Sequence, residues 1–250
     1  MNGSEGSARM RERLRGKRVI VLGGSSGIGY AVAAQAVEEG ADVVIASKSA
    51  ERVARAASEL GGRVEGRTLD LFDERAIEAF FGETGAFDHL AFTAGDTLHL
   101  TDLRTADLQK ARQAFDVRYW ATLAAARYAA PHLREGGSMV LTSGISAHRP
   151  AKGWVLGASV CGAVDALTRA LAIEFAPLRV NAVSPGLVAT NLWQTMSEQD
   201  RRGMYESAAK ALPAGHVGHA GDVAAAYLFL MKSAFATGQI HVVDGGALIA

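Results

Sequence analysis

The stretch Arg18-Val19-Ile20-Val21-Leu22-Gly23-Gly24-Ser25-Ser26-Gly27-Ile28-Gly29 decides the fold of this chain. A short run of β-branched residues ends in a loop with four glycines, and a helical pattern then continues to Glu39. Glycines in such a loop allow a tight turn and close backbone approach to a pyrophosphate, whose charge the helix N-terminus attracts. The strand-loop-helix order predicts a dinucleotide site at Gly23, Ser25, Ser26, Gly27, Ile28 and Gly29.

Six further β-rich runs alternate with helical stretches along the rest of the chain. The expected strands cover residues 18–22, 42–47, 63–69, 87–93, 138–143, 179–184 and 239–243. This alternation is typical of βαβ units, in which helices cover both faces of a parallel sheet. We therefore predict an α/β fold, a Rossmann-like, doubly wound sandwich of three layers and about seven strands. Alanine-rich helices are expected near 105–133 and 157–176.

The composition of the 250-residue chain is that of one ordinary soluble domain. Its 26 basic residues balance 26 acidic ones, which argues against nucleic acid as a partner. A single cysteine excludes an internal disulfide framework, and no Cys–His cluster has metal-ligand spacing. We expect a flexible arm at 1–16, one domain at 17–250, a cytoplasmic location and a small-molecule substrate. Neither a metal nor a membrane is expected to bind.

Residues at the ends of the second and third predicted strands indicate which nucleotide binds. Ser47 and Lys48 stand where a protein that binds NAD(H) places an Asp or Glu against the ribose hydroxyls. A lysine instead suits a 2′-phosphate, so the sequence favours NADP(H) over NAD(H). Asp70 and Leu71 follow the third strand, where the carboxylate either accepts from the adenine amino group or caps the next helix.

Four motifs in order resemble the short-chain dehydrogenase/reductase family over residues 17–246. The glycine loop is similar to the family's T-G-x-x-x-G-I-G except at Leu22, and F-T-A-G at 92–95 takes the place of N-N-A-G. N-A-V-S-P-G at 181–186 resembles the segment that holds the nicotinamide carboxamide, and 237–246 resembles the closing strand. The resemblance implies an oligomer, a homodimer or homotetramer. It adds to the cofactor site Thr93, Ala94, Gly95, Pro185, Gly186, Val188 and Thr190.

All four catalytic positions of that family are changed in this chain. The family uses an Asn, a Ser, a Tyr and a Lys. Alignment on the flanking motifs places Arg118 at the Asn position, Gly144 at the Ser, Gly157 at the Tyr and Cys161 at the Lys. Ser143 directly precedes the serine position and, with Arg118, is our candidate to polarise a substrate oxygen. Loss of a general acid costs on the order of 100- to 10,000-fold in rate.

Three functions are compatible with this pattern. The first is an NADP(H)-dependent reductase with a non-standard active site that acts on a carbonyl, enone, quinone or imine of a small apolar substrate. The second is a non-redox enzyme, such as a cyclase, isomerase or dehydratase, with His148, Lys152 or Cys161 as acid or base. The third is a non-catalytic protein that binds NADP(H).

Several candidate residues also have a purely structural interpretation. Arg118 is close enough in sequence to pair with Asp116, and Ser143 at a strand end can satisfy backbone groups. Substrate specificity is expected in the loop 145–156 and in a lid at 192–212. The tryptophans of these segments, Trp154 and Trp193, either wall the substrate pocket or cover apolar surface.

Overall fold

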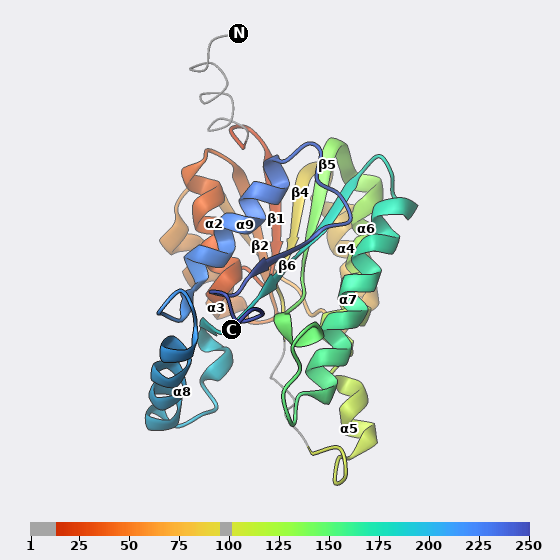
Figure 1. Ribbon diagram of the computed structural model, residues 1–250. Helices are drawn as coiled ribbons and strands as arrows, with labels where there is room; N and C mark the ends of the chain where they lie inside the picture. The colour runs from red at the N-terminus through yellow and green to blue at the C-terminus, as the bar shows by residue number, and fades with distance from the viewer. Residues whose placement is uncertain (1–13, 96–101) are drawn as a thin grey trace.

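A computed structural model describes residues 14–95 and 102–250 and confirms the Rossmann-like α/β fold (Figure 1). Seven parallel strands form the main sheet in the order β3-β2-β1-β4-β5-β6-β9. Their bounds are β1 Arg18–Leu22, β2 Asp42–Ser47, β3 Val64–Thr68, β4 Phe87–Phe92, β5 Leu133–Thr142, β6 Arg179–Pro185 and β9 Ile240–Val243. A second, two-stranded parallel pair consists of β7 (Val188–Ala189) and β8 (Gly218–His219).

Helices cover both faces of the sheet, as predicted (Figure 1). Along β1, Val19 and Val21 point into one apolar cluster, while Ile20 and Leu22 point into the other. This alternation follows from the two-residue period of a strand. Because both faces are covered, all four residues from Val19 to Leu22 are apolar. The first cluster lies under α2 (Gly27–Glu38), α3 (Ala50–Leu60) and α9 (Ala220–Lys232), and the second under α4 (Glu74–Thr84), α6 (Thr122–Ala129) and α7 (Val155–Glu174).

The prediction of one continuous helix near 105–133 is wrong. The structure divides this stretch into α5 (Leu108–Gln113), a π-helical turn η1 (Asp116–Ala121), α6 and a 3-10 turn η2 (Ala130–His132). π-Helical turns are rare in proteins overall, and those that occur are often located at functional sites. The interruption therefore singles out η1, which carries Arg118.

Two helices extend past the carboxyl edge of the sheet. Figure 1 shows α5 below α7 on one side and α8 (Glu198–Ala211) on the other. α8 lies within the segment expected to form a lid, after the short turn η4 (Asn191–Trp193). Another 3-10 turn, η3 (Ile145–Ala147), follows β5 and packs against α7.

The domain begins slightly earlier than expected. Leu14 is fully buried in the core, and the amide of Gly16 donates to the Gly40 carbonyl at 3.1 Å. Residues 14–16, which we assigned to the flexible arm, thus pack on the domain, whereas 1–13 lie outside the described residues. Within the described part, only α7 is long and apolar enough to span a membrane, and its Val164, Leu167 and Leu171 belong to the core over the sheet.

Candidate active site

The glycine loop after β1 packs directly against the loop after β4. A Cβ on Gly23 would lie 2.6 Å from the Ala94 nitrogen, and one on Gly29 would lie 2.3 Å from Thr93 Oγ1. Side chains cannot occupy such space, and Gly23 also has a φ of 88°. Thr93 Oγ1 donates to the Leu22 carbonyl at 2.8 Å and holds the two loops together. The predicted cofactor residues of both loops are therefore in one place.

The start of α2 has the features of a phosphate site. Ser26 precedes the helix with extended backbone and makes no capping hydrogen bond from its side chain. No acidic residue lies in the first turn, so the amides and the helix dipole can accept an anion. Ser25, Gly27 and Ile28 belong to this same loop and first turn, and a Cβ on Gly27 would lie 3.7 Å from Thr190. The cradle fits a dinucleotide pyrophosphate.

Lys48, which we expect to contact the 2′-phosphate, lies beside Asp70. The two residues follow β2 and β3, which are neighbours in the sheet. Lys48 Nζ lies 2.8 Å from Asp70 Oδ2, and the lysine side chain is 67% exposed. A hydrogen bond from Lys48 and one from the Phe72 amide hold the pKa of Asp70 below its usual range. The Lys48 ammonium also lies 5.3 Å from the centre of the Phe72 ring. Ser47 and Leu71 flank this cluster.

The suggestion that Asp70 caps the following helix is wrong. The cap of α4 is Asp73, whose Oδ1 accepts from the amides of Arg75 and Ala76 at 2.9 and 3.3 Å. Asp70 is thus available to a ligand at the carboxyl edge, although it must then share its carboxylate with Lys48.

The segment expected beside the nicotinamide reaches the same edge of the sheet. The amide of Gly186 donates to the Val243 carbonyl at 2.9 Å, and a Cβ on Gly186 would lie 2.8 Å from Asp244 Cα. The Pro185 carbonyl lies 3.9 Å from the Cβ position of Gly144. Val188 is buried, and Thr190 caps η4. The ends of β5 and β6 therefore meet where the substrate is expected.

The positions of the lost serine and lysine face each other. A Cβ on Gly144 would lie 3.1 Å from Cys161 Sγ, which supports the alignment that assigned them. Ser143 is buried, and its Oγ donates to the Cys161 carbonyl at 3.2 Å, in agreement with its structural interpretation. Burial raises the pKa of the Cys161 thiol, while a hydrogen bond from Ser146 and the charge of Arg118 act in the opposite direction. The thiol is therefore a poor nucleophile at neutral pH.

Arg118 reaches the end of β4 from η1. Its Nη2 lies 2.8 Å from the Cβ position of Gly95, so the guanidinium rests against the backbone of the loop after β4. η1 also packs against α7, the helix that carries Cys161, and the charge of Arg118 acts to lower the pKa of the Cys161 thiol. A positive charge thus stands beside the vacated lysine position.

The position of the lost tyrosine is covered by an indole. A Cβ on Gly157 would lie 3.3 Å from Trp154 Cε3. The Trp154 ring centre lies 6.5 Å from that of Trp193, with 52° between the planes. Trp193 is buried, and its Nε1 donates to the Val188 carbonyl at 2.9 Å. The two segments expected to set specificity therefore contact each other through their tryptophans.

His148, a candidate acid or base, pairs with Asp165 of α7, a residue that the sequence analysis did not name. His148 Nε2 lies 3.2 Å from Asp165 Oδ2, and Asp165 is buried, with Oδ1 lacking a hydrogen-bond partner. Asp165 follows Cys161 by one helical turn, so the i, i+4 spacing was the signal that could have found it. Lys152 is exposed in the loop before α7.

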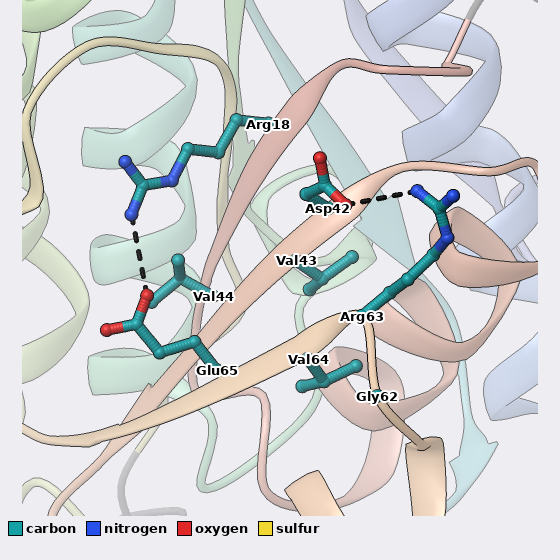
Figure 2. A pocket seen from close by; sticks show the side chains of 8 residues that line it. All are labelled: Arg18, Asp42, Val43, Val44, Gly62, Arg63, Val64 and Glu65. Atoms are coloured by element: carbon teal, nitrogen blue, oxygen red, sulfur yellow. Dashed lines mark hydrogen bonds and ion pairs between the residues drawn. The ribbon is translucent and has the colours of Figure 1, made fainter.

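A shallow hollow lies at the opposite, amino-terminal edge of the sheet (Figure 2). Its charged groups are paired, with Arg63 to Asp42 at 3.1 Å and Arg18 to Glu65 at 3.5 Å. None of the predicted site residues lines it. Among residues 14–95 and 102–250, no group of three or more His, Cys, Asp or Glu is placed to hold a metal ion.

Comparison with known proteins agrees with this geometry. A family model described as enoyl-(acyl carrier protein) reductase matches residues 23–247. The chain belongs to the short-chain dehydrogenase/reductase family. The short-chain dehydrogenase/reductase ATR9 of Stachybotrys chlorohalonatus is 36% identical, with 94% of this chain and 98% of that protein aligned.

Two solved structures extend the comparison. A small-chain dehydrogenase in complex with NADPH is 37% identical, with a TM-score of 0.84 over 94% of this chain and 100% of that one. The reductase/Diels-Alderase MalC of Malbranchea aurantiaca is 32% identical, with a TM-score of 0.90 over 97% of this chain and 100% of that one. The matching family members carry the names of reductases and dehydrogenases, and one holds NADPH, so the expected class of oxidoreductase with a nicotinamide cofactor is supported at this level.

Proposed function

We propose that this protein is an NADP(H)-dependent oxidoreductase that reduces a conjugated carbonyl, quinone or imine of a small apolar substrate, without a tyrosine proton donor. The proposal rests on the contrast between the nucleotide half of the site, which is retained, and the proton-transfer half, which is lost. The glycine cradle fits a dinucleotide, whereas Gly144, Gly157 and Cys161 replace the proton-transfer groups. Lys48 at the end of β2, without a carboxylate beside it in sequence, supports NADP(H) over NAD(H).

A bound nicotinamide supplies a hydride, and the residues of this chain decide which acceptor can use it. An alkoxide formed from a simple ketone needs a proton at once, and neither glycine can donate one. Cys161 carries a half-buried thiol, whose pKa is raised by burial, in place of a lysine. An enone or quinone spreads the new charge over a conjugated oxyanion, and an iminium carbon needs no coupled proton.

Arg118 is the residue we assign to that developing charge. Its guanidinium lies against Gly95, and its turn η1 packs on α7, at the carboxyl edge where the acceptor is expected. A guanidinium stays protonated at any relevant pH, so it contributes electrostatic stabilisation and not a proton. Ser143 donates to the Cys161 carbonyl and is therefore the weaker candidate.

The experiment is a titration of the purified protein with NADPH and NADH, followed by a panel of acceptors. We expect tighter binding of NADPH, its oxidation by an enone, quinone or cyclic imine, and little turnover of simple ketones. Arg118→Ala should lower kcat by about tenfold to a hundredfold if one charge-assisted contact to the transition state is lost. Arg112→Ala, on the exposed face of α5, is the matched control. Equal rates in the two variants would remove Arg118 from the mechanism.

A non-redox reaction is the second candidate, supported by the same loss of proton-transfer groups and by the likeness to MalC, a reductase/Diels-Alderase. Under this alternative the cofactor site contributes only to the shape of the pocket. The product then has the mass of the substrate after cyclisation or isomerisation, or is lighter by one water after dehydration. Mass spectrometry separates the two, because reduction adds two hydrogens. Tight NADPH binding with no product from any acceptor would instead favour a non-catalytic, NADP(H)-binding protein.

A further inference from the structure

The loss of the family's tyrosine and the position of Trp154 are one structural change. The six-membered ring of Trp154 approaches the Gly157 Cβ position at 3.3 Å through Cε3 and at 3.9 Å through Cζ3. The first distance is shorter than most real Cβ contacts, so any side chain at 157 would push the indole away. The ring therefore lies in the direction in which a tyrosine at this position would leave α7.

Trp154 is held in this place by its backbone and by a second indole. Its amide donates to the Ala151 carbonyl at 3.0 Å, and its own carbonyl accepts from Ala158 at 2.8 Å in the first turn of α7. Trp193, only 8% exposed, stands behind it at a ring-centre distance of 6.5 Å. That distance is within the range of a direct aromatic pair and leaves no room for a ligand between the rings.

The exposed surface of this pair belongs to Trp154, and it lies at the substrate end of the fold. Trp193 is tied to the Val188 carbonyl, in the segment that continues to Thr190 beside the glycine loop. Gly157 and Cys161 are one turn apart on the same face of α7, and Cys161 on that face lies against Gly144. A substrate that reaches the vacated tyrosine position meets an indole ring where relatives with the tyrosine present a hydroxyl.

We propose that Trp154 determines substrate specificity by stacking against a flat, conjugated ring of the acceptor, in the space where the family places its tyrosine. The inference rests on the proposed function and names the substrate class of that same site. Stacked aromatic pairs contribute beyond the area they bury, by an amount that corresponds to a preference of about threefold to tenfold. A saturated ring or a hydroxyl-rich chain of equal size gains no such term.

The test compares α-tetralone with α-decalone, two bicyclic ketones that differ in one aromatic ring. Calorimetric titration of the complex with NADP+ measures the dissociation constant of each ketone and needs no turnover. The variants are Trp154→Leu, which removes the aromatic ring, and Trp154→Phe, which keeps a smaller one. Trp120→Leu is the control, because Trp120 is 57% exposed on η1 and packs on Tyr119.

We expect the wild type and Trp120→Leu to prefer α-tetralone by about threefold to tenfold, and Trp154→Phe to keep part of that preference. Trp154→Leu should bind both ketones alike while its dissociation constant for NADPH stays that of the wild type. A preference that survives in Trp154→Leu, or that is absent from the wild-type complex, overturns the role of Trp154 and leaves the proposed function standing. Failure of the wild type to bind either nucleotide overturns the proposed function itself.

Discussion

Acidification should destabilise this protein through His89, a buried histidine on β4. His89 is 5% exposed, and its Nδ1 pairs with Ser138 Oγ at 2.9 Å across the β4–β5 ladder. The pKa of His89 is lowered from 6.5 to about 4, chiefly by burial; Asp88 opposes this shift, and the charges of Arg179 and Lys17 add to it. The folded state therefore binds fewer protons than the unfolded chain between these two values.

The sign and size of the effect follow from proton linkage. The contribution is complete above pH 6.5 and is lost as the pH falls toward 4, because only the unfolded chain gains the proton. At about 1.4 kcal/mol per pKa unit, the whole difference corresponds to roughly 3 kcal/mol, of which roughly 2 is lost by pH 5. Typical domains have stabilities of about 5–15 kcal/mol, so the loss is measurable.

Urea denaturation followed by tryptophan fluorescence at several values between pH 7.5 and 5 measures this loss. His89→Asn keeps an amide that can pair with Ser138 but cannot titrate, so its free energy of unfolding should fall less steeply than that of the wild type. His241→Asn, at an exposed position on β9, is the control and should follow the wild type. Parallel curves for the wild type and His89→Asn would refute the assignment.

Three further predictions concern the site. Gly29→Ala should weaken NADPH binding by at least about tenfold, because the alanine Cβ would lie 2.3 Å from the Gly23 carbonyl oxygen. Gly82→Ala, where the space around the Cβ is open, should leave NADPH binding unchanged, and fluorescence titration measures both. Lys48→Ala should raise the dissociation constant for NADPH by about tenfold or more and leave that for NADH within about twofold, and equal effects on both would contradict a 2′-phosphate contact. A triple variant with Gly144→Ser, Gly157→Tyr and Cys161→Lys should gain less than about tenfold in ketone reduction until Trp154→Ala is added, since the indole lies against position 157; steady-state assays with a simple ketone decide this.

Most of the sheet could be predicted from the sequence because buried parallel strands are continuous apolar runs. β1 and β2 have the expected bounds, and the others differ by a few residues at their ends. The start of β5 at Leu133 was missed, because R-E-G-G at 134–137 has the composition of a turn. The π-helical turn η1 was also missed, because the alanine-rich stretch around it has an unbroken helical pattern.

Candidate site residues could be predicted where backbone geometry demands a residue type. The contacts of Gly23 and Gly29 with the loop after β4 follow from strand order, which brings the ends of β1 and β4 together. The contact of Trp154 with Gly157 could not be predicted, because it depends on the rotamer of an indole in an irregular loop. The pairing of His148 with Asp165 likewise depends on how η3 settles on α7.

The nucleotide cradle is built mainly of main-chain atoms, and this has an evolutionary consequence. Amides, carbonyls and missing Cβ atoms shape the space between the loops after β1 and β4. The substituted positions 144, 157 and 161 make their contacts elsewhere, around the ends of β5 and β6 and along α7. A lineage can therefore replace its proton-transfer side chains one after another while its affinity for dinucleotide persists, which makes such a scaffold a natural starting point for new reactions.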